Sequence, residues 1–398
     1  MTKVINKSKL IDCCIFVRNG VSVKQDKTSG GIPITRIETI SKGDINQNKV
    51  GFAGIDEPDK YKSYFLKEGD VLISHINSVE HLGKTAIYEG IPATLIHGMN
   101  LLCIRPNSEI VLPKFLLYFT KSPAFRNQLP KITNKSVNQA SFSSSNLKNK
   151  ILVPIPTLEE QKLIVSILDQ VDALRCKRKE AIKLQDEYVK SVFLEMFADP
   201  VTNPKGIEQK AVMEMGRVVT GNTPPRANRS NYGNFIEWIK SDNINNDFCI
   251  ATKAREWLSE EGAKSARIAP ANSILVTCIA GSKSCIGNCG VIDRDASFNQ
   301  QINAIIPHAD VDPYFLYVQM KLAKELFQKA ATSGMKGLLS KSRFSKVQLL
   351  NPDIREQKEF ADKFIKCEAT KKKMAQQQVE IENQFNSLMQ RAFAGALT

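Results

Sequence analysis

The feature that most constrains the fold is an internal duplication, because short matches recur in the same order in both halves of the chain. Residues 156–162 (PTLEEQK) match residues 352–358 (PDIREQK) at an offset of 196. Four more matches pair 17–20 with 218–221, 34–40 with 238–244, 113–116 with 313–316, and 197–198 with 393–394. Loop insertions and deletions explain an offset that drifts by a few residues. Ordered repeats of this kind predict one structural unit present twice in the 398 residues.

Each copy is predicted to begin with a mixed body of strands and helices. Short apolar runs at 71–74, 101–104, 273–277 and 302–306 are bounded by Gly, Pro, Asn and Ser, which is typical of strands and turns. Helical patterns occupy 113–129 and 313–331, and both have proline near the first turn, where its missing N–H costs nothing. The predicted fold class is therefore α+β, with two tandem mixed α/β bodies.

Each body is predicted to be followed by a long helix, at 156–199 and 352–398. Thr157 with Glu160, and Asp353 with Glu356, have the spacing of an N-terminal capping box. Neither segment contains glycine or proline over about 40 residues, which as a helix span roughly 60 Å. Apolar residues then recur every three or four positions, as in a coiled-coil seam. Five polar residues interrupt this seam: Arg175, Arg178, Gln185, Lys371 and Gln378. The predicted seam comprises Ile164, Leu168, Val171, Val189, Val192, Phe360, Phe364, Met374, Ile381, Phe385 and Leu388.

The simplest way to bury both apolar stripes is an antiparallel coiled coil of the two long helices. Residues 200–206, which contain two prolines and a glycine, are predicted to form the linker to the second body. The predicted domains are thus 1–155, the central helix 156–199, the linker 200–206, 207–351, and the C-terminal helix 352–398.

Composition and charge restrict the class of function. Hydrophobic residues make up 42% and charged residues 24%, a globular balance, and no apolar run approaches the roughly 20 residues of a membrane helix. The net charge is +14, and it is shared evenly: residues 1–199 hold 28 basic and 21 acidic side chains, and the remainder hold 27 and 20. Two basic bodies of +7 each predict an acidic partner, with nucleic acid as the first candidate. Nine cysteines without framework spacing favour free thiols in a reducing cytoplasm, so a cytoplasmic location is expected.

Motifs that would carry catalysis or bind a metal are weak. Gly83-Lys-Thr85 ends like a phosphate-binding loop, but Ser78 stands where that loop requires glycine. Pro352-Asp353 with Glu356-Gln-Lys358 resembles a nuclease motif compressed onto one helical turn, so a capping box explains it better. The sequence contains no Asn-Pro-Pro-Tyr or Asp-Pro-Pro-Tyr tetrapeptide of amino-methyltransferases. Cys285 and Cys289, with Cys278 nearby, are expected to be buried thiols and not a zinc site.

This organisation resembles the specificity (S) subunit of type I restriction–modification systems. The resemblance rests on the PTLEEQK and PDIREQK helix starts, on Gly20-Val-Ser and Gly221-Asn-Thr-Pro-Pro, and on segment 238–244. It implies a non-catalytic subunit in which each target-recognition domain reads one half of a bipartite, asymmetric site on double-stranded DNA. It further implies that the long helices set the spacing and dock methyltransferase (M) subunits, expected to be two, and that motor–nuclease (R) subunits join for restriction. S-adenosylmethionine, ATP and Mg would belong to those partners in adenine-N6 methylation and restriction, and this chain would bind no cofactor.

Loops near the repeated motifs supply the side chains that phosphate contact and base reading need. Any single one of them could instead be an ordinary solvated residue. The candidates in the first body are Lys24, Arg36, Lys42, His75, Asn77, Lys84 and Asn138, and those in the second are Thr223, Arg226, Arg229, Lys240, Asp242, Asn243, Lys283 and Lys336.

Two alternative functions remain open from the sequence. One is a DNA methyltransferase or nuclease fused to recognition domains, against which the missing motifs argue. The other is a helical scaffold that binds proteins and no DNA, against which the charge of +7 on each half argues.

Overall fold

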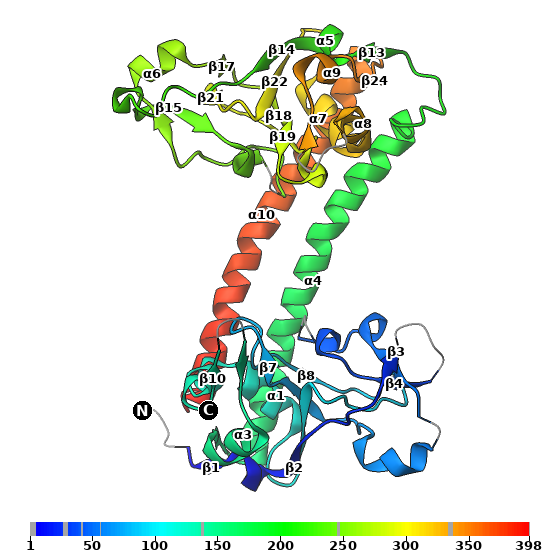
Figure 1. Cartoon of the computed structure of the whole chain (residues 1–398), viewed down its shortest axis with the longest axis vertical. Helices are drawn as coiled ribbons and strands as arrows, with labels where there is room; N and C mark the ends of the chain where they lie inside the picture. Colours follow the sequence, from blue (N-terminus) through cyan, green and yellow to red (C-terminus); the bar gives the residue numbers. More distant parts are fainter. Residues whose placement is uncertain are drawn as a thin grey trace. The chain divides into compact units, whose positions relative to one another are not determined.

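The computed structural model describes residues 5–26, 31–40, 43–55, 57–136, 139–244, 247–332 and 337–397. It divides into two compact units (Figure 1): unit 1 is Met1–Lys177 with Gln378–Thr398, and unit 2 is Arg178–Gln377. Each unit therefore contains one body together with part of each long helix.

Unit 1 is built around a four-stranded antiparallel sheet with strand order β2-β9-β6-β8. Helix α1 lies against this sheet, and its phenylalanines Phe115 and Phe119 are fully buried. The elements of unit 1 are β1 Lys7–Lys9, β2 Cys14–Asn19, β3 Gln25–Asp26, β4 Ile32–Ile34, β5 Gly51–Ala53, β6 Val71–Ser74, β7 Ile76–Asn77, β8 Thr85–Ile87, β9 Leu101–Pro106, α1 Pro113–Lys121, α2 Pro123–Arg126, β10 Asn134–Lys135, β11 Ala140–Ser141, α3 Ser144–Lys150, β12 Leu152–Pro154 and the first part of α4 Leu158–Phe197.

Unit 2 repeats that sheet as β14-β22-β18-β20, and the predicted duplication is thereby confirmed. In unit 1 Ile104 of β9 lies opposite Val17 and Val71, and in unit 2 Ile305 of β22 lies opposite Val218 and Ile274. The elements are β13 Gln209–Ala211, α5 Val212–Met215, β14 Gly216–Thr220, β15 Tyr232–Ile239, β16 Trp257–Leu258, α6 Glu260–Ser265, β17 Ile268–Ala269, β18 Ile274–Thr277, β19 Ile279–Ala280, β20 Cys289–Val291, β21 Ala296–Phe298, β22 Ile302–Pro307, α7 Pro313–Leu322, α8 Lys324–Ala330, β23 Gly337–Leu338, α9 Lys341–Ser345, β24 Gln348–Leu350 and α10 Ile354–Phe393.

The two copies differ in their second sheet. Unit 2 has a four-stranded sheet of order β16-β15-β21-β17, in which β15 and β21 are parallel. Unit 1 has a three-stranded antiparallel sheet of order β3-β5-β4 in the corresponding part of the chain. The sheet that carries the common core is therefore shared, whereas the smaller sheet beside it is particular to each copy.

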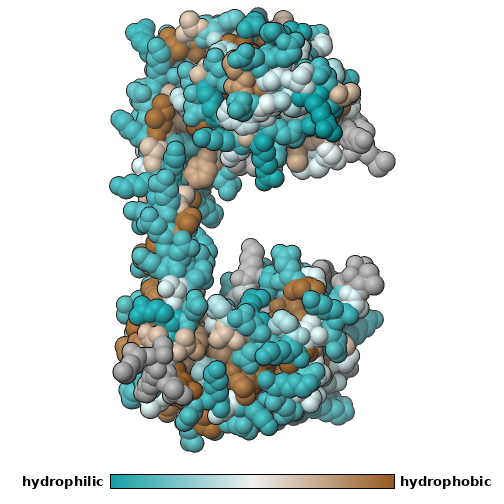
Figure 2. Space-filling model, turned by 90° about the vertical axis from the view of Figure 1, so that its left-hand side faces the viewer, coloured by the Kyte–Doolittle hydropathy of each residue, from teal (hydrophilic) through white to brown (hydrophobic). Residues whose placement is uncertain are grey.

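The long helices α4 and α10 pair in antiparallel fashion, as predicted. In unit 1 the first turns of α4 and the last turns of α10 belong to the same core. In that core Phe393 of α10 packs against Phe115 of α1 at a centroid distance of 5.2 Å. In unit 2 the last turns of α4 meet the first turns of α10, where the rings of Phe193 and Phe360 are 5.3 Å apart. On the face drawn in Figure 2 the helices are mainly hydrophilic, with apolar side chains showing in places.

The eleven predicted seam residues are all buried or half-buried. Several of them contact a body as well as the opposite helix. Ile164, Leu168 and Phe385 belong to the core of unit 1, and Phe360 and Phe364 belong to that of unit 2. The ends of the helix pair are therefore embedded in the two cores.

Two of the polar residues that interrupt the seam, Arg175 and Lys371, form ion pairs between the helices. Arg175 binds Glu382 with an N–O distance of 2.7 Å, and its guanidinium lies 4.1 Å from the Phe385 ring centroid. Lys371 is buried and binds Asp186 at 2.7 Å. Gln378 is different, because both polar atoms of its amide are buried and lack a hydrogen-bond partner within the described part of the chain.

A buried glutamine explains the repeated motif at the start of each long helix. The Gln161 Oε1 accepts from the Leu112 N–H at 2.8 Å, and the Gln357 Oε1 accepts from the Asp312 N–H at 2.9 Å. Their Nε2 groups donate to the carbonyls of Pro156 and Pro352 at 3.0 and 2.8 Å. The same glutamine thus fastens each helix to the loop before α1 or α7.

The capping prediction holds for the first helix only. Thr157 and Glu160 exchange hydrogen bonds of 2.9 and 3.3 Å, which is a capping box. Asp353 instead accepts from the Arg355 N–H at 2.8 Å, and among the described residues no bond returns from Glu356. The second predicted box is therefore wrong: Asp353 caps its helix without help from Glu356.

No helix in the described ranges is both long enough and apolar enough to cross a lipid bilayer.

Candidate nucleic-acid interface

Two of the predicted DNA contacts, Arg36 and Lys240, lie beside a glycine turn that has the same geometry in both units. Gly20 follows β2 and Gly221 follows β14. A Cβ atom added to Gly20 would lie within 3.0 Å of the Gly98 carbonyl oxygen, and one added to Gly221 would lie equally near the Asn299 carbonyl oxygen. Only glycine allows the two backbones to approach so closely. The motif glycines therefore hold two polar loops together in each unit.

A cation follows this turn in both units and is held by the same hydrogen bond. Arg36 precedes the 3-10 helix η2 (Ile37–Ile40), and Lys240 precedes η7 (Ser241–Ile244). The Arg36 N–H donates to the Thr39 hydroxyl at 2.8 Å, and the Lys240 N–H donates to the Asn243 Oδ1 at 3.0 Å. Arg36 and Lys240 thus occupy equivalent positions, as their sequence match predicts.

In unit 2 the side chain of Lys240 belongs to a cluster of two cations and one carboxylate. Lys240 forms an ion pair with Glu256, and Arg226 binds the other oxygen of Glu256 at 2.8 Å. The Lys240 Nζ lies 4.9 Å, and the Arg226 Cζ lies 5.2 Å, from the ring of the buried Trp238. The Lys240 ion pair is the main cause that lowers the pKa of the Glu256 carboxyl, so this carboxylate is charged at neutral pH.

The other candidates in unit 2 lie on polar turns. The Thr223 hydroxyl donates to Gln300 on the turn between β21 and β22, the turn that contacts Gly221. Asp242, Arg229 and Lys283 are exposed and lie in the 3-10 helices η7, η6 (Arg229–Asn231) and η8 (Lys283–Cys285).

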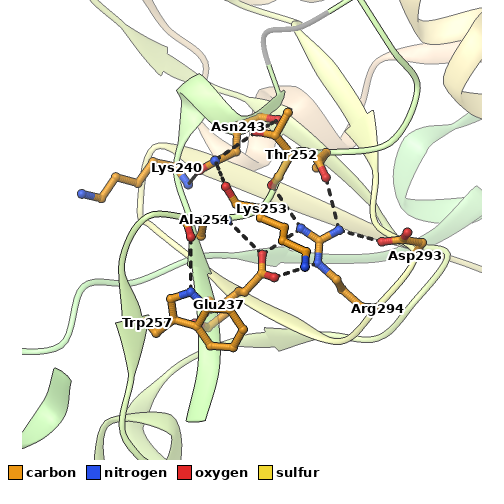
Figure 3. A network of polar contacts seen from close by, with 11 residues as sticks. Glu237, Lys240, Asn243, Thr252, Lys253, Ala254, Trp257, Asp293 and Arg294 are labelled. Atoms are coloured by element: carbon orange, nitrogen blue, oxygen red, sulfur yellow. Dashed lines mark hydrogen bonds and ion pairs between the residues drawn. The ribbon is translucent and has the colours of Figure 1, made fainter. Parts of the chain in front are cut away.

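A network of polar contacts next to Lys240 braces the loops and includes Asn243 (Figure 3). The buried Glu237 accepts from the Arg294 Nη2 at 2.7 Å and from the Ala254 N–H at 3.0 Å. The Asn243 Nδ2 donates to the Lys253 carbonyl at 3.0 Å, and its side chain is 7% exposed. Asn243 thus braces its loop, in the position that Thr39 takes in unit 1. The Lys240 side chain points away from this network (Figure 3).

In unit 1 Arg36 lines a small polar pocket. The Arg36 Nε lies 3.4 Å from the Glu38 carboxylate, and both side chains are partly exposed. The pocket has a volume of about 310 Å³ and is lined by Gln25, Thr35, Arg36, Ile37, Glu38, Met99 and Asn100. Lys24, the neighbour of Gln25, is exposed.

His75, another predicted contact, is buried. The ring is 7% exposed and packs against Phe142, and its Nδ1 has no hydrogen-bond partner within the described residues. Burial lowers the pKa of His75, which favours the neutral ring. Asn77 is half-buried and donates to the Ser74 hydroxyl at 3.3 Å, and Lys84 is half-buried. Lys42, Asn138 and Lys336 lie outside the described residues.

Sequence reasoning missed Glu256, Gln300, Asn100 and Gln25. Glu256 lies 16 positions from Lys240 and in no motif, so only the pairing of β15 with β16 brings the two together. Gln300 and Asn100 could have been found, because they follow Asn299 and Gly98, the partners of the motif glycines, at nearly the same repeat offset.

The described residues contain no cluster of ligands suited to a metal ion. Burial raises the pKa of Cys278 and Cys289 to about 12 each, so both thiols are protonated. The chemistry that the interface offers is the binding of a polyanion by cations and amides.

Comparison with known proteins gives consistent relatives. A family model described as "Type I restriction modification DNA specificity domain" matches residues 5–184 and again 204–383. The chain is 30% identical over 372 residues to a putative type I restriction enzyme MjaX specificity subunit of Methanocaldococcus jannaschii, covering 89% of this chain and 84% of the relative. It is 26% identical over 392 residues to the HindI specificity subunit of Haemophilus influenzae, covering 79% and 84%.

Two solved structures share the fold. One comes from a study titled as the structural basis of complex assembly and conformational transition of the type I R-M system, with a TM-score of 0.58, 19% identity and full coverage of both chains. The other is the type I restriction–modification S subunit from M. genitalium, with a TM-score of 0.58, 12% identity, and coverage of 98% of this chain and 96% of that one.

Proposed function

Because this chain belongs to the family of type I restriction–modification DNA specificity domains, we propose that each of its two units reads one half of a bipartite DNA site. The chain is a specificity subunit, and its role is DNA sequence recognition. In this proposal it is non-catalytic, and adenine-N6 methylation and cleavage belong to the M and R subunits with which it assembles. Those subunits would also bind the S-adenosylmethionine, ATP and Mg that the reactions need.

The observation that carries the proposal is the equivalent cation in two different surroundings. Arg36 and Lys240 are anchored by the same backbone hydrogen bond, and each lies beside the glycine-held turn. Around Lys240 are a buried indole, a second cation and Glu256, whereas around Arg36 are Glu38, Met99 and Asn100. One scaffold with two sets of polar side chains suits the recognition of two different base sequences.

The long helices fit the remaining part of the proposal. Each is a continuous helix of 40 residues, and at 1.5 Å per residue such a helix is about 60 Å long. Readers of neighbouring sites on one face of B-DNA need a separation of roughly 34–36 Å or its multiples. We propose that these helices fix the spacing of the half-sites and dock the M subunits, two of them by analogy with the two repeats.

The test is a genome-wide map of N6-methyladenine in cells that hold the neighbouring methyltransferase gene, with this gene present and then deleted. The expected result is a split motif with a fixed spacer that disappears on deletion. A scaffold that binds proteins alone would leave the map unchanged.

Single substitutions assign the half-sites. Replacing Arg36 by glutamine should weaken methylation through one half-site, and replacing Lys240 by glutamine should weaken it through the other. A lost bidentate base contact costs about 1–3 kcal/mol, or roughly 5- to 150-fold in binding. An equal loss on all sequences would show that these cations contact only phosphates.

A further inference from the structure

The cation that each unit presents beside its glycine turn is paired with a carboxylate, and the two carboxylates come from different places. In unit 1 Glu38 lies two residues after Arg36, at 3.4 Å. In unit 2 Glu256 approaches Lys240 from the turn before β16. The equivalent of Glu38 in the repeat is Asp242, which is exposed and is not the partner of Lys240. Both units thus contain a cation–carboxylate pair at this position, and the carboxylate comes from a different part of the chain in each unit.

In unit 2 the carboxylate lies between both cations of the cluster. Glu256 Oε2 is 2.8 Å from Arg226, and its other oxygen is bonded to Lys240. The side chains are 57% exposed for Arg226, 31% for Lys240 and 36% for Glu256, so solvent and ligands can reach the cluster. The backbone N–H of Trp238 donates to the Glu256 carbonyl at 3.0 Å, and this bond fixes Glu256 beside β15.

These ion pairs are poorly placed to stabilise the fold. Water screens pairs this exposed, and they contribute little to stability. The bracing of the same loops comes from Glu237, which is 5% exposed and binds Arg294 through two hydrogen bonds. An effect of Glu256 on ligand binding therefore explains its position better than a contribution to the stability of unit 2.

A carboxylate in this place acts differently on the two parts of DNA. A phosphate that approached Lys240 or Arg226 would meet a negative charge between them, and repulsion would weaken its binding. A base edge carries no net charge, and the amino groups of cytosine and adenine can donate to a carboxylate, while guanine offers acceptors to the cations.

We propose that Glu256 is a specificity-determining residue that keeps Lys240 and Arg226 from binding phosphates and reserves them for base edges. The proposal rests on the proposed function of unit 2 as a DNA reader. Glu38 performs the same task for Arg36 in unit 1.

The experiment uses Glu256→Gln in the full chain, assembled with its methyltransferase subunit. Binding to a duplex that lacks the mapped motif is measured between 50 and 200 mM salt. Each phosphate that the freed cations engage steepens the dependence of log K on log salt by about 0.9. The affinity of the variant relative to wild type should therefore be about 3.5-fold higher at 50 than at 200 mM salt for one phosphate, and about 12-fold higher for two. The ratio of target to non-target affinity should fall.

The matched control is Glu261→Gln, which removes the same charge from an exposed pair with Lys264 in the same unit. Its salt dependence should stay at the wild-type value. Glu38→Gln is a second, independent variant, and it should steepen the salt dependence through unit 1.

An unchanged salt dependence in Glu256→Gln overturns the proposal. So does a loss of target affinity at constant non-target affinity, because Glu256 would then be a base contact only. A wild-type complex with no preference for any motif would instead refute the proposed function, and the two failures are thus distinguishable.

Discussion

The glutamine that fastens each long helix to its own body should be an essential contact for stability. Gln357 is completely buried, its Oε1 accepts from the Asp312 N–H at 2.9 Å, and its Nε2 donates to the Pro352 carbonyl at 2.8 Å. Methionine has a similar shape but no amide, so Gln357→Met removes the partner of the part-buried Asp312 N–H and of the buried Pro352 carbonyl. Each such group costs about 1–3 kcal/mol, and we expect a loss of about 3 kcal/mol in the free energy of unfolding of unit 2.

Tryptophan fluorescence makes the loss measurable in one unit. The two tryptophans of the chain, Trp238 and Trp257, both lie in unit 2. In urea, Gln357→Met should move the fluorescence transition to lower denaturant. Gln161→Met removes the equivalent contact from unit 1, and its direct effect should appear in circular dichroism before it appears in fluorescence.

The control is Gln376→Met, the same substitution at an exposed position of α10. It should change the free energy of unfolding by less than about 0.5 kcal/mol. If Gln357→Met unfolds at the same urea concentration as this control, the buried hydrogen bonds do not fasten the helix and the reasoning is wrong.

Two further predictions concern pH and the glycine turn. Burial lowers the pKa of His97 to about 4, below the value of about 6.5 in the unfolded chain. The unfolded chain therefore takes up this proton first as pH falls, and unit 1 should lose about 3 kcal/mol of stability between pH 6.5 and 4, with the full contribution present above pH 6.5. Urea unfolding followed by circular dichroism checks this, and His97→Gln should remove that step. Gly221→Ala places a methyl group against the Asn299 backbone and should destabilise unit 2 by about 1–3 kcal/mol. Gly281→Ala, where an added Cβ meets nothing within 4 Å, should leave the fluorescence transition in place.

The architecture could be predicted from the sequence because the two halves of the chain can be compared with each other. A motif that occurs twice in the same order needs no relative to be recognised, and Thr157 with Glu160 marks the start of a helix by purely local chemistry. The antiparallel pairing followed from two apolar stripes whose simplest burial was against each other, although the structure shows that the bodies also cover part of them.

The candidate site was predictable only in part, because burial of a polar side chain depends on the whole fold. Asn243 and His75 are residue types that often contact DNA. In the structure, however, Asn243 braces a loop and His75 packs against Phe142. The reverse holds for Glu256, which becomes part of the cluster only because β15 pairs with β16. Arg36 and Lys240 remain predicted contacts, now placed at equivalent positions.

The way in which the units share the long helices has a consequence for synthesis on the ribosome. Unit 2 is one continuous stretch, residues 178–377, and its core is complete once that stretch has been made. Unit 1 emerges first, but Phe385 and Phe393 belong to its core and are joined to it across more than 200 residues. Domains generally fold in the order in which they are made. In this chain the core of the first body is the last to be completed, because it includes the last turns of α10.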